Sequence, residues 1–153
     1  MTLALKTPKE LSRAALVGLL AAIGTAIVTV PLFKSGLPPM PEAPSLAFAK
    51  TLFGPVPDPV GVIFHLLYVT GVTTAFLALA GARPSLSRIV GVSAVFYVLA
   101  LAVFFPIVGW GFAGLAVTPK IAVAALVPHV LYGLLLWGAD RVVFGTPRRH
   151  GYA

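Results

Sequence analysis

The sequence contains no cysteine and only four acidic residues in 153. The absence of cysteine excludes disulfides, thiolate metal ligands and thiol catalysis. Charged residues of both signs make up 10% of the chain, whereas an ordinary soluble domain has about 25%. So few charges do not cover the surface of a soluble protein of this length. Most of the surface is therefore expected to face lipid.

Apolar residues are abundant instead. They make up 59% of the chain, and the mean hydropathy is +1.01. A membrane-spanning helix needs roughly 20 mostly apolar residues in succession, and four segments meet this requirement. The sequence therefore predicts an all-α membrane protein, a four-transmembrane-helix bundle that forms a single membrane domain over 1–153. The predicted spans are 11–33, 59–82, 89–108 and 119–143.

The connection over 34–58 is long and rich in proline. Residues 45–53 within it predict a short helix at the membrane interface. Its expected apolar face consists of Leu46, Ala49, Leu52 and Phe53. An ordered coil packed on the mouth of the bundle is the alternative.

The first span carries small residues on one helical face. They are Ala14, Gly18, Ala21, Ala22 and Gly24. Small residues let neighbouring helices approach closely within a membrane. We therefore expect this face to be the packing face of the helix.

The basic residues indicate the orientation in the membrane. One side of the predicted topology has Lys34, Lys50 and Lys120. The other side has Lys6, Lys9, Arg13, Arg83, Arg88, Arg141, Arg148 and Arg149. Loops with an excess of Lys and Arg remain in the cytoplasm, so both termini are predicted to be cytoplasmic. This distribution explains the net charge of +7 as membrane anchoring, and we expect the lipid bilayer rather than nucleic acid as the partner.

A weak internal repeat relates the two halves of the chain. The motif His65-Leu66-Leu67-Tyr68 matches His129-Val130-Leu131-Tyr132, and a glycine follows each histidine by 16 positions. The span before each motif also ends in a similar sequence, Val30-Pro31-Leu32-Phe33 in one case and Phe105-Pro106-Ile107-Val108 in the other. The repeat predicts two pseudo-symmetric helix hairpins about an axis along the membrane normal.

The two histidines are the ionisable residues expected within the spans. Such residues are rare in membranes and usually face the bundle interior. We expect His65 and His129 to line a ligand site between the second and fourth spans, together with Tyr68 and Tyr132. Gly61 and Gly133 lie one turn from the histidines and would leave room for a ligand.

The most specific interpretation of this pair is a bis-histidine site for haem b, because histidines from two helices can bind both axial positions of the iron. A second interpretation is proton transfer, since His and Tyr at positions i and i+3 lie on one helical face and imidazole titrates near neutrality. The structural alternative is that each histidine forms a hydrogen bond across the bundle and fixes the helix register.

The sequence contains no Walker loop, nucleophile elbow, dinucleotide-binding glycine motif, zinc-protease motif or paired carboxylates. With four acids in the whole chain, general acid–base catalysis is not expected. The predicted function is non-enzymatic. Besides ligand binding, the chain could be an electron-transfer subunit, a component of a proton-coupled channel or transporter, or an accessory subunit of a larger complex, and self-association is a further hypothesis.

Residues 60–143 resemble the YagU-like family of bacterial inner-membrane proteins. The resemblance rests on His65, on Phe105-Pro106-Ile107-Val108-Gly109, on Pro128-His129-Val130-Leu131 and on Asp140-Arg141. It implies a multi-pass protein of the inner membrane with a suggested link to acid tolerance. It implies no catalytic residues, because the family has none defined.

Overall fold

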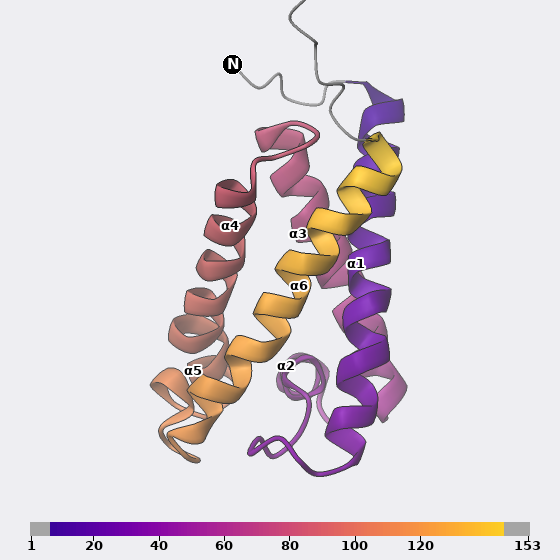
Figure 1. The fold of residues 1–153 in the computed structure, drawn as a ribbon. Helices are drawn as coiled ribbons and strands as arrows, with labels where there is room; N and C mark the ends of the chain where they lie inside the picture. The colour runs from indigo at the N-terminus through magenta and orange to yellow at the C-terminus, as the bar shows by residue number, and fades with distance from the viewer. Residues whose placement is uncertain (1–6, 146–153) are drawn as a thin grey trace, which may run out of the picture.

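The computed structural model describes residues 7–145, and this part of the chain is helical without any strand (Figure 1). Four helical segments are long and apolar enough to cross a membrane, which confirms the predicted all-α fold with four candidate spans. They are α1 (Pro8–Lys34), α3 (Asp58–Ala80), Leu86–Ile107 and α6 (Lys120–Phe144). The basic residues Lys6, Arg148 and Arg149 lie outside the described part.

Local signals explain where the helices begin and end. α1 begins at Pro8 rather than residue 11, because Thr7 and Glu10 form a capping box before the apolar run. The Thr7 hydroxyl accepts a hydrogen bond from the Glu10 amide at 3.2 Å, and the Glu10 carboxylate accepts one from the Thr7 amide at 3.0 Å. α3 ends at Ala80 because Gly81 has φ +80°, a backbone conformation that favours glycine.

The third span is not a uniform helix. α4 (Leu86–Leu99) continues into one π-helical turn, η1 (Ala100–Phe104), and then into the short α5 (Phe105–Ile107). In this turn the Phe105 amide donates to the carbonyl of Ala100, which is five residues earlier. Pro106 follows directly, and a proline ring crowds the preceding turn of an ordinary helix. The wider π turn relieves that crowding.

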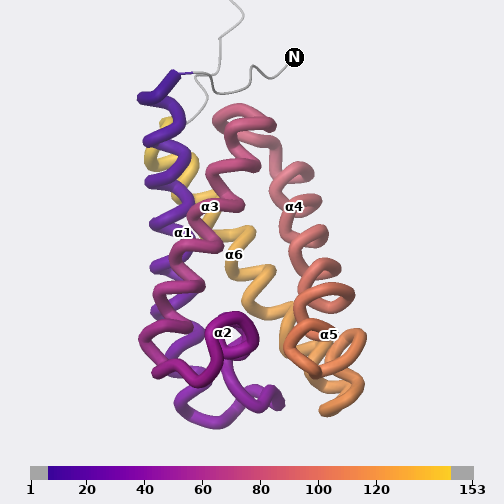
Figure 2. The backbone as a smooth tube through the Cα atoms, turned by 180° about the vertical axis from the view of Figure 1, so that it is seen from behind, coloured from indigo at the N-terminus to yellow at the C-terminus, as the bar shows by residue number. Residues whose placement is uncertain are grey.

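The helices form an open ring. α1 packs along both α3 and α6, and α4 packs mainly against α6. α3 and α4 are joined at the end where α1 begins and α6 ends, which we call the termini end, and they diverge toward the opposite end (Figure 2). There the short helix α2 (Pro44–Phe53) lies between α3 and the third span, so we call this the α2 end. The 3-10 turn η2 (Phe112–Gly114) precedes α6 at the same end.

The termini half of the bundle is a packed core. Its buried members are Ala14, Val17, Ala21, Ala22, Val69, Leu77, Ile89, Tyr132 and Leu136. At Gly18, an added Cβ would lie 2.8 Å from the carbonyl oxygen of Thr70, so the backbones of α1 and α3 are in contact. The small residues of α1 therefore form the close-packed face that the sequence predicts, with Gly24 in contact with Leu135 of α6.

At the α2 end, helix α2 contacts both α3 and the π turn of the third span. A Cβ at Gly61 of α3 would lie 2.8 Å from the Cα of Leu46, so α2 lies directly on α3. The ring of Phe48 lies 5.4 Å from that of Phe64 and 4.7 Å from that of Phe104 in η1. α2 is thus the helix expected over 45–53, but its buried face differs from the expected one. Leu46, Ala47 and Ala49 are buried, whereas Leu52 and Phe53 are exposed.

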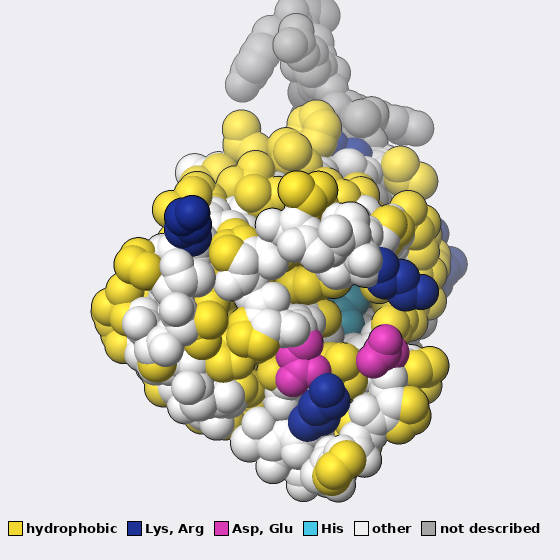
Figure 3. All heavy atoms as spheres, turned by 90° about the horizontal axis from the view of Figure 1, so that it is seen from below, with side chains coloured by type: hydrophobic (Ala, Val, Ile, Leu, Met, Phe, Trp, Pro, Cys, Tyr) yellow, Lys and Arg dark blue, Asp and Glu magenta, His cyan; other side chains and the backbone are white. Residues whose placement is uncertain are grey.

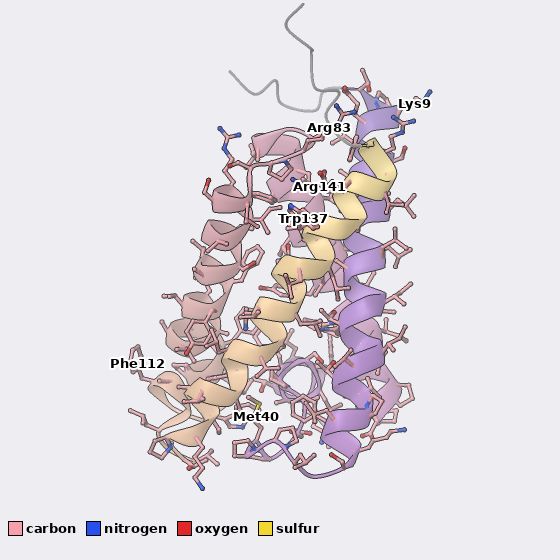
Figure 4. All side chains as sticks on the ribbon, in the orientation of Figure 1. Lys9, Met40, Arg83, Phe112, Trp137 and Arg141 are labelled. Carbon is pink, nitrogen blue, oxygen red and sulfur yellow. The ribbon has the colours of Figure 1, made fainter. Side chains whose placement is uncertain are left out.

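Asp140 fixes the turn between α3 and α4 at the termini end. Its carboxylate is fully buried, and Oδ1 accepts a hydrogen bond from the backbone amide of Arg83 at 3.1 Å. Arg83 has φ +58°, which a non-glycine residue rarely adopts. Its guanidinium donates to the carbonyl of Phe144, so the turn also covers the last turn of α6. Figure 4 shows Arg83 and Arg141 at this end.

Candidate ligand-binding cavity

A cavity of about 1270 Å³ occupies the α2 half of the bundle. Its lining begins on α1 at Thr25, extends on α3 to Val72 and on α6 from Ala124 to Tyr132, and includes Phe104 of the π turn. Viewed from the α2 end, the surface is hollowed, and a histidine side chain is visible at the bottom of the hollow (Figure 3). Toward this end α6 diverges from α1 and α4 diverges from α3 (Figures 1 and 2).

The cavity is closed toward the termini end. The hydroxyl groups of Thr73 and Tyr132 form a hydrogen bond of 2.9 Å at its floor. One helical turn further, Leu77 and Leu136 are both fully buried. Two buried leucines form an apolar barrier beyond the hydrogen-bonded pair, so the cavity ends blindly within the bundle.

The cavity mouth is charged and its side walls are apolar. Lys34, Glu42, Lys50 and Asp58 lie at the mouth, where Lys50 Nζ is 2.5 Å from the Glu42 carboxylate. Acidic and basic side chains flank the hollow in Figure 3. Between α1 and α6 the lining is aliphatic and partly exposed. Its members there are Val28, Leu32, Val127 and Leu131.

His65 lines the cavity and joins α3 to α1. Its Nε2 lies 2.9 Å from the hydroxyl of Thr25. The same hydroxyl lies 2.9 Å from the carbonyl oxygens of Ala21 and Ala22. A hydroxyl has a single hydrogen, which it donates to these carbonyls, so Nε2 of His65 carries a hydrogen and donates to Thr25. In the neutral imidazole, Nδ1 is then a hydrogen-bond acceptor.

His129 also lines the cavity, on the opposite side, and joins α6 to α4. Its Nδ1 lies 2.7 Å from the carbonyl oxygen of Ala125, and its ring interacts with the carbonyl of Phe96 as well. The ring of Tyr97 meets the imidazole edge-on at 5.6 Å, while the Tyr97 hydroxyl donates to the Ala122 carbonyl at 3.0 Å. Each histidine therefore stabilises a contact between two helices and exposes part of its ring to the cavity.

The two tyrosines of the repeated motif have different environments. Tyr132 is buried, and its hydroxyl is paired with Thr73. Tyr68 lines the cavity half-buried, with its ring 5.4 Å from that of Phe104. Within residues 7–145, no hydrogen-bond partner exists for the Tyr68 hydroxyl. Tyr132 is therefore part of the floor, and Tyr68 is available to a ligand.

The expected free space beside Gly61 and Gly133 is filled. Gly61 is covered by Leu46 of α2, and a Cβ at Gly133 would lie 2.7 Å from the hydroxyl of Ser93 in α4. Both glycines permit close contacts between helices. Gly61 nevertheless lines the cavity together with His65, whereas Gly133 does not line it. The expectation of room beside the histidine is therefore wrong at Gly133, because the sequence did not reveal that this glycine faces Ser93.

The arrangement also bears on the alternative functions. Ligation of haem through Nε2 of His65 would break the hydrogen bond of this nitrogen with Thr25. Among the described residues, no group of three or more His, Asp or Glu side chains could hold a metal ion. A proton path from the cavity would have to pass Leu77 and Leu136, which carry no polar atoms in their side chains. Binding of a ligand in the cavity requires neither a broken hydrogen bond at His65 nor a polar path past the two leucines.

Sequence reasoning missed Thr25 and Phe104 as parts of the site. Thr25 follows Ala21 by one helical turn on the small-residue face of α1, so that periodicity carried a usable signal. The position of Phe104 depends on the π turn, which leaves no comparable signal in the apolar sequence.

A comparison of the chain with protein-family models, curated proteins and solved structures found no match. The resemblance to the YagU-like family therefore remains a prediction.

Proposed function

We propose that this protein is a small, non-enzymatic membrane protein that binds an amphipathic molecule in the cavity of its α2 half. The observation that carries the proposal is the shape of that cavity, which is large, apolar-walled and blind, with His65, His129 and Tyr68 on its surface. Ligand sites in proteins are typically concave and mostly apolar, with a few polar groups that fix the orientation of the ligand.

The basic residues support an orientation with the termini in the cytoplasm. Within the described chain, the termini end has Lys9, Arg13, Arg83, Arg88 and Arg141, and the α2 end has Lys34, Lys50 and Lys120. By the positive-inside rule the cavity then opens away from the cytoplasm. In a bacterial cell of the kind that the YagU-like resemblance implies, this is the outer side of the inner membrane.

The pseudo-symmetry of the two hairpins belongs to the same proposal. The repeated histidines face one cavity from α3 and α6, which is the relation that a twofold axis along the membrane normal would give. The partners of the repeated residues differ, because Tyr68 is available in one copy and Tyr132 is hydrogen-bonded in the other. A ligand between two related hairpins would thus contact mainly the α3 copy.

Binding is tested with tritiated dodecanol and the protein in nanodiscs, by scintillation proximity, after subtraction of partitioning into empty nanodiscs. We expect saturable binding by the wild-type protein. Ala26 lines the cavity, so Ala26→Trp places a large side chain in the ligand volume. We expect it to lower the affinity by about tenfold or more, the effect of losing about 1.4 kcal/mol of binding free energy.

Ala94→Trp is the matched control, because Ala94 is exposed on α4 and does not line the cavity. We expect Ala94→Trp to bind dodecanol as the wild type does. Absence of saturable binding, or equal loss in both variants, would contradict the proposed function.

A further inference from the structure

The floor of the cavity presents two polar atoms without partners in the described chain. One is the hydroxyl oxygen of Tyr68, and the other is Nδ1 of His65. Thr25 bonds to His65 and Tyr132 to Thr73, so these hydroxyl groups are already paired. His129, on α6, donates from Nδ1 to the carbonyl of Ala125, so its Nε2 is a further acceptor among the cavity residues. Tyr68 and His65 differ from His129 in that they place a donor and an acceptor on one helix.

The two free atoms have complementary roles. The Tyr68 hydroxyl can donate a hydrogen bond, whereas Nδ1 of neutral His65 can only accept one, because the ring hydrogen is on Nε2. The two residues are three positions apart in α3 and lie on the same face of the helix. A single group that accepts from Tyr68 and donates to His65 would satisfy both atoms.

The absence of charged side chains at the floor further limits the kind of head group that can bind there. The charged residues that line the cavity are at its mouth, namely Lys34, Glu42, Lys50 and Asp58. At the floor the lining consists of neutral side chains such as Val69 and Val72. Burying an ion without a countercharge is costly. The head of the ligand is therefore uncharged.

The walls indicate what is attached to this head. Aromatic rings of Phe64 and Phe104 line one side, and aliphatic side chains line the opening between α1 and α6. Val28 and Val127 line the cavity and are also about half exposed, so a hydrocarbon chain that leads from the cavity to the lipid here would contact apolar side chains only. The lining thus suits a single chain whose polar end lies inside the protein.

From this geometry we propose that the cavity binds a single-chain amphiphile whose uncharged head both donates and accepts a hydrogen bond, that is, a long-chain alcohol or a protonated long-chain carboxylic acid. The head lies between Tyr68 and His65, and the chain leaves between α1 and α6. This inference rests on the proposed function and adds the chemical class of the ligand.

The test compares three probes of equal chain length in nanodiscs. Dodecanol donates and accepts, dodecyl methyl ether only accepts, and dodecane does neither. Affinities are measured by competition against tritiated dodecanol and corrected for partitioning into empty nanodiscs. We expect dodecanol to bind more tightly than the ether, and the ether more tightly than dodecane, with each lost hydrogen bond costing about 2- to 10-fold.

The variant Tyr68→Phe removes the donor and keeps the ring. It should lower the dodecanol affinity by about 2- to 10-fold and leave the dodecane affinity unchanged. Tyr97→Phe is the matched control, since Tyr97 donates to Ala122 and does not line the cavity. It should preserve the wild-type preference. The ratio of the two affinities within one variant is independent of the folded fraction.

Three results would overturn the inference, and they differ in what they imply. Equal affinity for the three probes, or an unchanged ratio in Tyr68→Phe, would contradict the proposed head group and leave a cavity that binds chains by their apolar part. Absence of saturable binding by any probe would contradict the proposed function as well.

Discussion

Replacing Gly18 with valine should separate α1 from α3 and lower the stability of the protein. An added Cβ would lie 2.8 Å from the carbonyl oxygen and 2.9 Å from the Cα of Thr70. These are backbone atoms, which cannot rotate away as a side-chain end can. Overpacking of this kind typically costs about 1–3 kcal/mol, and occasionally more. Reversible unfolding in mixed micelles, followed by circular dichroism, measures the change.

Gly71→Val is the control for Gly18→Val. Gly71 is on α3, directly after Thr70, and nothing lies within 4 Å of an added Cβ. The two variants have the same change in side chain and both lie in apolar helices, so a difference between them reports the contact with α1. Equal stability of the two would show that the helices are not in backbone contact at Gly18.

Replacing Asp140 with leucine should release the turn between α3 and α4. The substitution removes the acceptor of the Arg83 amide, and the loss of one hydrogen bond typically costs about 0.5–1.5 kcal/mol. The strained φ of Arg83 also loses the bond that supports it. We expect a matching loss of unfolding free energy and faster hydrogen exchange at residues 81–88.

A graded series separates the hydrogen bond of Asp140 from its charge. Asp140→Asn retains an acceptor for the Arg83 amide and loses the charge, which lies 3.7 Å from the Arg141 guanidinium. Its loss of stability should fall between that of Asp140→Leu and that of Asp58→Asn, an exposed residue expected to change little. If Asp140→Leu were as stable as the wild type, the turn would not depend on this carboxylate.

The number of spans and their approximate limits were predictable because they follow from apolar length. The four apolar runs form four helical segments in the structure. Their observed limits differ from the predicted ones by only a few residues, at places where a capping box or a glycine sets the helix end. The packing face of α1 was also predictable, because small residues repeat with helical spacing from Ala14 to Ala22.

The cavity was less predictable because it depends on how far helices diverge. The sequence places His65 and His129 within spans, but the partners of both rings come from neighbouring helices. The two copies of the repeat look alike in sequence, yet Thr73 pairs with Tyr132 and leaves Tyr68 unpaired. The same limit applies to Asp140, whose role depends on a turn that lies far away in the sequence.

The central claim is that the α2 half is hollow and the termini half is solid, and thiol labelling tests it most directly. The chain has no cysteine, so each introduced thiol is the only one present. Val72 lines the cavity, Leu77 is fully buried and Leu79 is 83% exposed on the outer face of α3, where lipid would surround it. The protein in nanodiscs is treated with methyl methanethiosulfonate, a small uncharged reagent that can enter a cavity with a neutral floor.

We predict that Val72→Cys is modified at least about tenfold faster than Leu77→Cys and Leu79→Cys, and that dodecanol slows its modification. The reagent reacts with the thiolate, which forms only where water reaches the thiol, so thiols held in lipid or in a packed core react poorly. Equal rates for the three variants, or slower modification of Val72→Cys than of Leu77→Cys, would contradict the account.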